Sequence, residues 1–190
     1  MKNEDVSALV FLYLLRGSKL PRYIQGVNMI KVCALTDATR KGFEKLFADY
    51  YEELDCGENV EHLLNEYILA DCLAGLIKID VIFEGETLAG FVIYQIDDIN
   101  NEWNLKEGWG DVREIYISPA FRRQGFGKFL LYTAEMKLKE AGAEKAYCLP
   151  YEAAVPFFTA CGYKDTLEYC EDLDCNIFAK ISLDNCECKK

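Results

Sequence analysis

The stretch RRQGFGKFLL, residues 122–131, combines residue types that suit a phosphate group. Gly125 and Gly127 lie one residue apart, and because glycine has no Cβ an anion can approach the main chain closely there. An apolar run follows at once, and the first turn of a helix presents N–H groups and a partial positive charge. We therefore predict an anion site made by the amides of residues 123–128. Three cations could offset the charge of the ligand: Arg122, Arg123 and Lys128. The alternative is a tight turn whose arginines are merely solvated.

The spacing excludes two common phosphate-binding motifs. A Walker loop needs a glycine five residues before its Gly-Lys pair and a Ser or Thr after it. Those positions hold Arg122 and Phe129. A dinucleotide-binding fingerprint needs a third glycine three residues after the second, where the sequence has Leu130.

The neighbouring pattern predicts the elements that position this turn. Residues 111–118 are predicted to form a strand that stops at Pro119, and helical spacing follows the turn. With a strand at 145–149 they form a right-handed βαβ unit. The other elements follow from periodicity and turn residues: a strand at 29–36, helices at 37–54 and 59–75, a hairpin over 76–97, a loop at 97–110, a short helix at 152–162, and a final hairpin from 163 to 182.

The composition of the 190-residue chain restricts its partners. The formal net charge is −11, and nucleic acids and anionic membranes both need an excess of cations, so neither is expected. The apolar run near the N-terminus is too short to span a bilayer, and we predict a helix at residues 4–16. Its hydrophobicity favours packing on the body of the protein or on a second subunit in a homodimer. Nine cysteines, mostly in apolar runs, indicate free thiols in a reducing cytoplasm.

Several motifs together resemble one family. Arg122, Gly125 and Gly127 match the pattern Arg/Gln-x-x-Gly-x-Gly/Ala, with IYISP before it and AAVPFFTACGY after it. This combination resembles the GNAT-type N-acetyltransferases. The resemblance implies an α/β (α+β) fold, with a mixed, mostly antiparallel sheet of about seven strands flanked by helices. The expected organisation is a helical extension at 1–27, an acyltransferase domain at 28–183 and a cysteine-containing tail at 184–190.

The resemblance also implies acetyl-CoA as co-substrate and no metal. The pyrophosphate would lie on the turn, and the pantetheine arm would bond the backbone of the preceding strand. The residues implied are Ile115, Ile117, Arg122, Arg123, Gln124, Gly125, Phe126, Gly127 and Lys128.

The implied reaction is direct attack of an amine on the thioester within a ternary complex. An alkyl ammonium is mostly protonated at pH 7, so a proton acceptor is needed. Glu114, in the strand before Pro119, is the candidate base or substrate anchor, and a structural salt bridge is the alternative. Many relatives carry a tyrosine as leaving-group acid where this chain has Phe158, so Tyr151, Tyr163 and Cys161 are the remaining candidates.

The acceptor is expected to be a small-molecule or peptide amine. An acidic and aromatic stretch at the end of the predicted helix at 37–54 would suit a cationic acceptor. A solvated helix end would explain the same residues. The members of this stretch are Asp49, Tyr50, Tyr51, Glu52, Glu53 and Asp55. Two other functions stay open: a non-catalytic acyl-CoA-binding protein, which Phe158 favours, and a metal- or redox-responsive interaction module built on the C-terminal cysteines. The cysteine spacing matches no standard zinc pattern, and His62 is the one histidine of the sequence.

Overall fold

The structure is a computed structural model and describes residues 30–55, 57, 59–99 and 104–183. The seven strands are β1 (Ile30–Ala34), β2 (Lys78–Glu84), β3 (Thr87–Ile96), β4 (Gly110–Ile117), β5 (Ala146–Cys148), β6 (Lys164–Cys170) and β7 (Cys175–Lys180). They form one sheet in the order β1-β2-β3-β4-β5-β7-β6. All neighbours are antiparallel except β4 and β5, which are parallel. The mixed, mostly antiparallel sheet expected from the sequence is confirmed.

The helices follow the predicted order with one difference. They are α2 (Asp37–Leu54), α3 (Val60–Leu63), α4 (Ala70–Ala74), α5 (Phe126–Glu140) and α6 (Val155–Ala160). The single helix predicted at 59–75 contains the π-helical stretch Leu64–Leu69, which separates α3 from α4. Short 3₁₀ turns lie at Pro119–Phe121 and Glu152–Ala154. Hydrophobic periodicity does not distinguish a π-helical turn from an α-helical one over six residues, so the sequence could not reveal this interruption.

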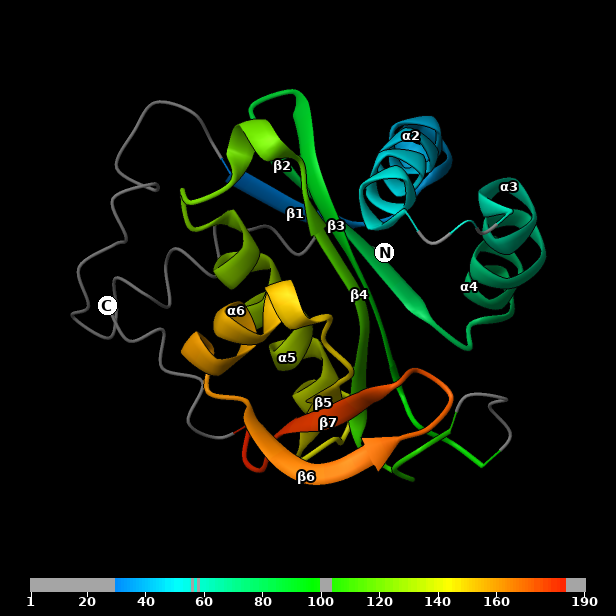
Figure 1. The fold of residues 1–190 in the computed structure, drawn as a ribbon. Coiled ribbons are helices and arrows are strands. Elements are labelled where there is room, and N and C mark those ends of the chain that lie inside the picture. Colours follow the sequence, from blue (N-terminus) through cyan, green and yellow to red (C-terminus); the bar gives the residue numbers. More distant parts are fainter. Residues whose placement is uncertain (1–29, 56, 58, 100–103, 184–190) are drawn as a thin grey trace.

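Helices cover both faces of the sheet. Figure 1 shows α2, α3 and α4 on one side of β3 and β4, and α5 and α6 on the other. Under α2 the rings of Phe43 and Phe91 meet edge to face at 5.1 Å, in a core that includes Phe47, Ile68 and Tyr116. The second core lies under α5 and α6. Residues of β4 pack into both cores, and the candidate site lies along that strand.

A buried carboxylate fixes the loop between β3 and β4. Asp97 Oδ2 accepts hydrogen bonds from the N–H groups of Leu105 and Lys106 at 2.9 and 2.8 Å, and from the Tyr147 hydroxyl at 2.7 Å. The loop therefore returns to the start of β4 at a defined position.

Some predictions fall outside the described residues. These are the helix at 4–16, the extension at 1–27 and the tail at 184–190, as well as residues 100–103 of the predicted loop. Among the helices that the structure does describe, none is both long and apolar enough to cross a membrane.

Candidate active site

Strands β4 and β5 pair over a short distance and then diverge. Their parallel register joins Gly110 to Ala146 and Asp111 to Tyr147. Beyond this point β4 continues to Ile117 without β5 as a neighbour, paired only with β3. The divergence coincides with a β-bulge, because the β3 partners of β4 shift by one residue around Arg113. A bulge bends its strand and increases the local twist, so β4 turns away from β5 at this point.

The diverging part of β4 has one open edge. The Ser118 N–H donates to the Ala89 carbonyl at 2.9 Å, and the register pairs Tyr116 with Phe91. Because hydrogen-bonding direction alternates along an antiparallel strand, the backbone groups of Ile115 and Ile117 point to the open side. These are the two residues that the family resemblance assigned to the pantetheine arm. The Ile117 carbonyl already accepts a hydrogen bond of 2.7 Å from Arg122 Nε, which leaves its N–H for a ligand.

The glycine turn connects this edge to α5. Arg123 has a φ of 62° and Gly125 a φ of 94°, and the helix begins at Phe126. The first N–H groups of a helix have no partner within it, so they point out of the turn. The Phe126 side chain is buried, and its ring lies 5.6 Å from that of Phe121 between centroids, which fixes the position of the turn. The backbone N–H of Phe126 belongs to the first turn of α5. Gly127 faces Phe157, whose ring would lie 3.2 Å from an added Cβ.

The three cations at the turn differ in their exposure and in their contacts. Arg123, like Gln124, is exposed, and Lys128 is half-buried at the start of α5. Arg122 instead bridges two elements: its Nη2 donates to Glu53 Oε2 on α2 at 2.6 Å, while its guanidinium lies 5.4 Å from the centre of the Tyr116 ring. Arg122 therefore holds the end of β4 and the end of α2 together.

Glu53 completes this link. Its second oxygen accepts a hydrogen bond of 2.7 Å from the Tyr116 hydroxyl. Partial burial on its own would raise the pKa of Glu53, but the hydrogen bonds from Arg122 and Tyr116 bring it below the ordinary value. The carboxylate is thus ionised and paired at neutral pH, although the pair is substantially exposed to solvent.

Removing the charge of Glu53 should weaken acetyl-CoA binding modestly. In Glu53→Gln, Arg122 loses its ionic partner, and the turn that it supports becomes less well ordered. We expect the dissociation constant for acetyl-CoA to rise up to about fivefold, since an exposed ion pair contributes at most about 1 kcal/mol. Glu52→Gln, which changes the neighbouring exposed carboxylate, is the matched control. A lower melting temperature with unchanged acetyl-CoA affinity would show that the link serves the fold alone.

Glu114 lies on the face of β4 that α2 covers. Its Oε1 accepts a hydrogen bond of 3.0 Å from the Tyr51 hydroxyl. Burial raises the pKa of Glu114, and hydrogen bonds from Tyr50 and Tyr51 offset part of that rise. Among the described residues no Lys or Arg nitrogen is recorded within 4.0 Å of this carboxylate, although the charge of Arg113 also lowers its pKa.

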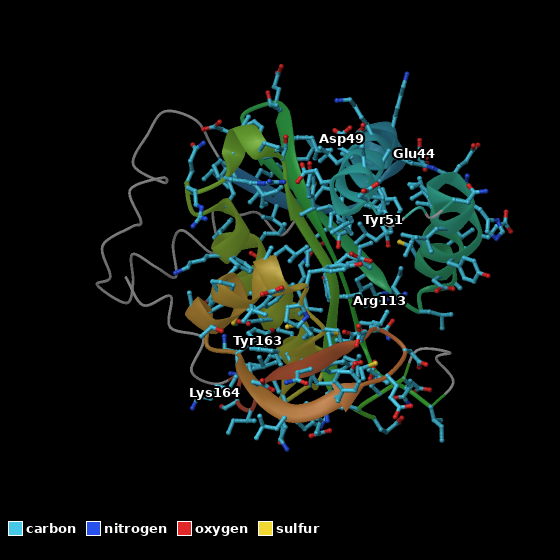
Figure 2. All side chains as sticks on the ribbon, viewed as in Figure 1. Glu44, Asp49, Tyr51, Arg113, Tyr163 and Lys164 are labelled. Carbon is cyan, nitrogen blue, oxygen red and sulfur yellow. The ribbon has the colours of Figure 1, made fainter. Side chains whose placement is uncertain are left out.

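The structure separates the two candidate tyrosines. Tyr151, which follows β5, is 57% exposed and lies near enough to Tyr50 to contribute to its raised pKa. Tyr163 is fully buried in the core under α6, where its ring meets that of Phe158 at 5.3 Å. Burial and the Glu135 carboxylate raise the pKa of Tyr163 well above its ordinary value. The structure thus places Tyr151 near Tyr50, which hydrogen-bonds to Glu114, and Tyr163 in a different environment. Figure 2 shows Tyr163 on the other side of the sheet from Tyr51.

Sequence reasoning did not identify the partners of Glu114. Tyr50 and Tyr51 were interpreted as part of an acceptor surface, and Glu53 as one of several acidic residues there. Tyr51 is 63 positions from Glu114, and Glu53 is 69 positions from Arg122. No spacing rule connects such distant residues, and the weak signal was a pair of tyrosines followed by carboxylates at the end of a helix.

The described part of the chain offers no metal site. Among its residues no group of three or more His, Cys, Asp or Glu side chains is arranged to hold a metal ion. Six cysteines there are free thiols: Cys33, Cys72, Cys148, Cys161, Cys170 and Cys175. Cys186 and Cys188 lie outside the described residues.

The sheet order and the parallel pair beside the glycine turn define the class of fold expected from the sequence, that of the GNAT-type acetyltransferases. The family model of the Acetyltransferase (GNAT) family matches residues 39–163. The chain therefore belongs to the GNAT acetyltransferase family. No curated protein matches the sequence.

Solved structures with a similar fold support this assignment. A GNAT-family acetyltransferase from Staphylococcus aureus Mu50 has a TM-score of 0.62 at 13% identity, covering 80% of this chain and 98% of that one. The PaiA N-acetyltransferase of Thermoplasma acidophilum, solved with coenzyme A, has a TM-score of 0.61 at 17% identity, with coverage of 80% and 98%. A mutant of the toxin AtaT, bound to the C-terminus of the antitoxin AtaR and acetyl-CoA, has a TM-score of 0.56 at 15% identity, with coverage of 80% and 92%.

Proposed function

We propose that this protein transfers the acetyl group of acetyl-CoA to a primary amine by direct attack in a ternary complex. The observation that carries the proposal is the position of Glu114 on the diverging part of β4. There a carboxylate with a raised pKa lies on one face of the sheet, while the glycine turn and α5 lie on the other. Family membership and the coenzyme A or acetyl-CoA in the PaiA and AtaT structures support the co-substrate.

The proposed cofactor site has two parts. The backbone of Ile115 and Ile117 would bond the pantetheine arm as an added strand along the open edge of β4. The first-turn N–H groups of α5, together with the turn around Gly125, would hold the diphosphate, because they combine close backbone approach with the positive end of a helix. Arg123 and Lys128 are the cations best placed for the phosphate charge, since Arg122 is held by Glu53.

In the proposed reaction Glu114 takes a proton from the acceptor ammonium. The free amine then attacks the thioester carbonyl and a C–N bond forms. As the C–S bond breaks and the thiolate of coenzyme A leaves, the nitrogen releases its second proton to solvent, which gives the neutral amide. A carboxylate with a raised pKa is a better base than an ordinary one, because the driving force for accepting the proton is larger. The hydroxyls of Tyr50 and Tyr51 keep the carboxylate oriented.

The leaving thiolate needs a proton or a stabilising group. Phe158 cannot supply one, and its buried ring packs between Phe157 and Tyr163. Tyr163 is buried with its pKa raised, which makes it a weaker acid. Tyr151 is exposed and lies near Tyr50, which hydrogen-bonds to Glu114, so we propose it as the leaving-group acid. A thiol has a pKa near that of cysteine, about 8.5, so unaided departure is the competing mechanism.

Tyr151→Phe separates these two mechanisms. If Tyr151 protonates the thiolate, kcat should fall by about 10²-fold, the lower range for general acid catalysis, with unchanged acetyl-CoA affinity. Tyr169→Phe, which removes the hydroxyl of an exposed tyrosine on β6, is the control. A kcat equal to that of the unaltered protein would mean that the thiolate leaves without help from Tyr151.

A panel of primary amines with thiol release as readout tests the function itself. The competing non-catalytic acyl-CoA-binding protein would bind acetyl-CoA but release no thiol with any amine. Failure to bind acetyl-CoA in a calorimetric titration would exclude both functions. The free thiols at the six described cysteines support a cytoplasmic location, and the homodimer remains a prediction for sedimentation measurements.

A further inference from the structure

Arg113, on the same strand as Glu114, is a partly buried cation that forms no ion pair within 4.0 Å among the described residues, although its charge lowers the pKa of Glu114 and that of Asp111. Its guanidinium makes one hydrogen bond within that part of the chain, a long contact of 3.4 Å from Nη1 to Gln95 Oε1. No described carboxylate lies within 4.0 Å of it, although Asp111 and Glu114 are close in sequence. A guanidinium carries five donors and stays charged, so this one has most of its donors available for a ligand.

The β-bulge directs Arg113 and Glu114 toward the same face of the sheet. Ile93 pairs with Glu114 and Tyr94 with Val112, so Arg113 is the extra residue of β4. A bulge interrupts the alternation of side chains that a regular strand would impose. Gln95, which Arg113 contacts, pairs directly with Asp111 on the neighbouring strand. Figure 2 shows Arg113 and Tyr51, the partner of Glu114, on the α2 side of the sheet.

Asp111, two positions before Arg113, forms no ion pair with it within 4.0 Å. Asp111 is buried, and its Oδ1 has no hydrogen-bond partner. Burial, together with the nearby Asp97, raises the pKa of Asp111 well above its ordinary value, and the charge of Arg113 offsets part of that rise. Arg113 thus places a positive charge beside the proposed base, in a protein whose formal net charge is −11.

We propose that Arg113 binds a carboxylate of the acceptor, and that the acceptor is a small amino acid whose amine lies at Glu114. The inference rests on the proposed acetyl transfer to an amine and names its substrate class. A planar guanidinium binds a carboxylate through two parallel hydrogen bonds. A doubly charged phosphate would also meet Glu114 and the buried Asp97, which favours the singly charged carboxylate. Arg113 and Glu114 are adjacent residues, so the carboxylate and the amine must be separated by few bonds.

Matched pairs of acceptors test this substrate class. Each pair consists of an amino acid and the amine that lacks its carboxylate: lysine and cadaverine, ornithine and putrescine, tyrosine and tyramine, serine and ethanolamine. The corresponding amino acid amides form a third set, which keeps the size but removes the negative charge. Amides also have less basic amines, so amides and decarboxylated amines together bracket the effect of amine basicity on the rate. Thiol release and the mass of the acetylated product are the readouts.

In each pair that reacts, we expect kcat/KM to be at least about tenfold higher for the amino acid than for the amine that lacks the carboxylate. The reason is the strength of hydrogen bonds between charged groups. Arg113→Gln should lower kcat/KM for amino acids by about 10- to 100-fold more than for the matched amines, which also report any effect on Glu114. Arg113→Lys should restore part of the preference, because it keeps the charge without the planar pair of donors. Arg40→Gln, which removes an exposed arginine on α2, is the control, and acetyl-CoA affinity should stay constant throughout.

Three outcomes would overturn the inference. Equal or faster transfer to the amines would exclude carboxylate recognition while acetyl transfer stands. An undiminished preference for acids in Arg113→Gln would place the carboxylate site elsewhere. Bound acetyl-CoA without transfer to either class would remove both the inference and the proposed function.

Discussion

Gly125→Glu is expected to weaken acetyl-CoA binding by about 100-fold or more, equivalent to about 2.7 kcal/mol. The new carboxylate would lie at the N-terminus of α5, where the diphosphate of acetyl-CoA is proposed to bind. It would repel the phosphates and also satisfy the free N–H groups that the ligand needs. Calorimetric titration with acetyl-CoA measures the effect.

The control for this variant is Gly142→Glu. Gly125 and Gly142 have φ values of 94° and 107°, so any other residue strains the backbone at both positions, by about 1–2 kcal/mol. Gly142 lies beyond the opposite end of α5, with no atom near an added Cβ. Both variants should therefore lose similar thermal stability, and Gly125→Glu alone should lose acetyl-CoA. Wild-type affinity in Gly125→Glu would place the diphosphate away from this turn.

Glu114→Gln should lower kcat/KM for amine acetylation by about 10²- to 10⁴-fold, the contribution of a general base. The activity of the unaltered protein should rise with pH through the pKa of Glu114, which burial holds above its ordinary value. Glutamine cannot ionise, so this limb should disappear from the pH–rate profile of the variant. Acetyl-CoA affinity should stay the same. Retention of the limb would identify another base and leave Glu114 as an anchor.

The raised pKa of Glu114 also predicts how Glu114→Gln affects the stability of the fold. A carboxyl group whose pKa is higher in the folded protein than in the unfolded chain disfavours folding once it ionises. The unaltered protein therefore loses stability as the pH rises from the ordinary carboxyl value through the raised one. Glu114→Gln avoids this loss and should melt no lower than the unaltered protein at neutral pH. A large drop in the melting temperature would mean that the ionised carboxylate stabilises the fold.

The order and type of the elements were predictable because they depend on local patterns. Helix α2 was expected at 37–54, where the structure has it, since apolar residues recur at helical spacing. The glycine turn was predictable as well. Gly125 precedes an apolar helical run, and its positive φ follows from the sharp entry into α5.

Tertiary structure alone decided which side chains meet at the candidate site. The contacts of Tyr51 with Glu114 and of Glu53 with Arg122 join α2 to strands and turns more than sixty positions away. Tyr151 and Tyr163 were equivalent candidates on sequence, and the structure distinguishes them because one follows β5 at the surface and the other lies in the core. The extra residue in β4 gives no signal in the sequence, because a bulge is defined by the partner strand, β3. The sequence determined the elements through local spacing, and packing of the sheet determined the chemistry along β4 because side-chain direction depends on the register between strands.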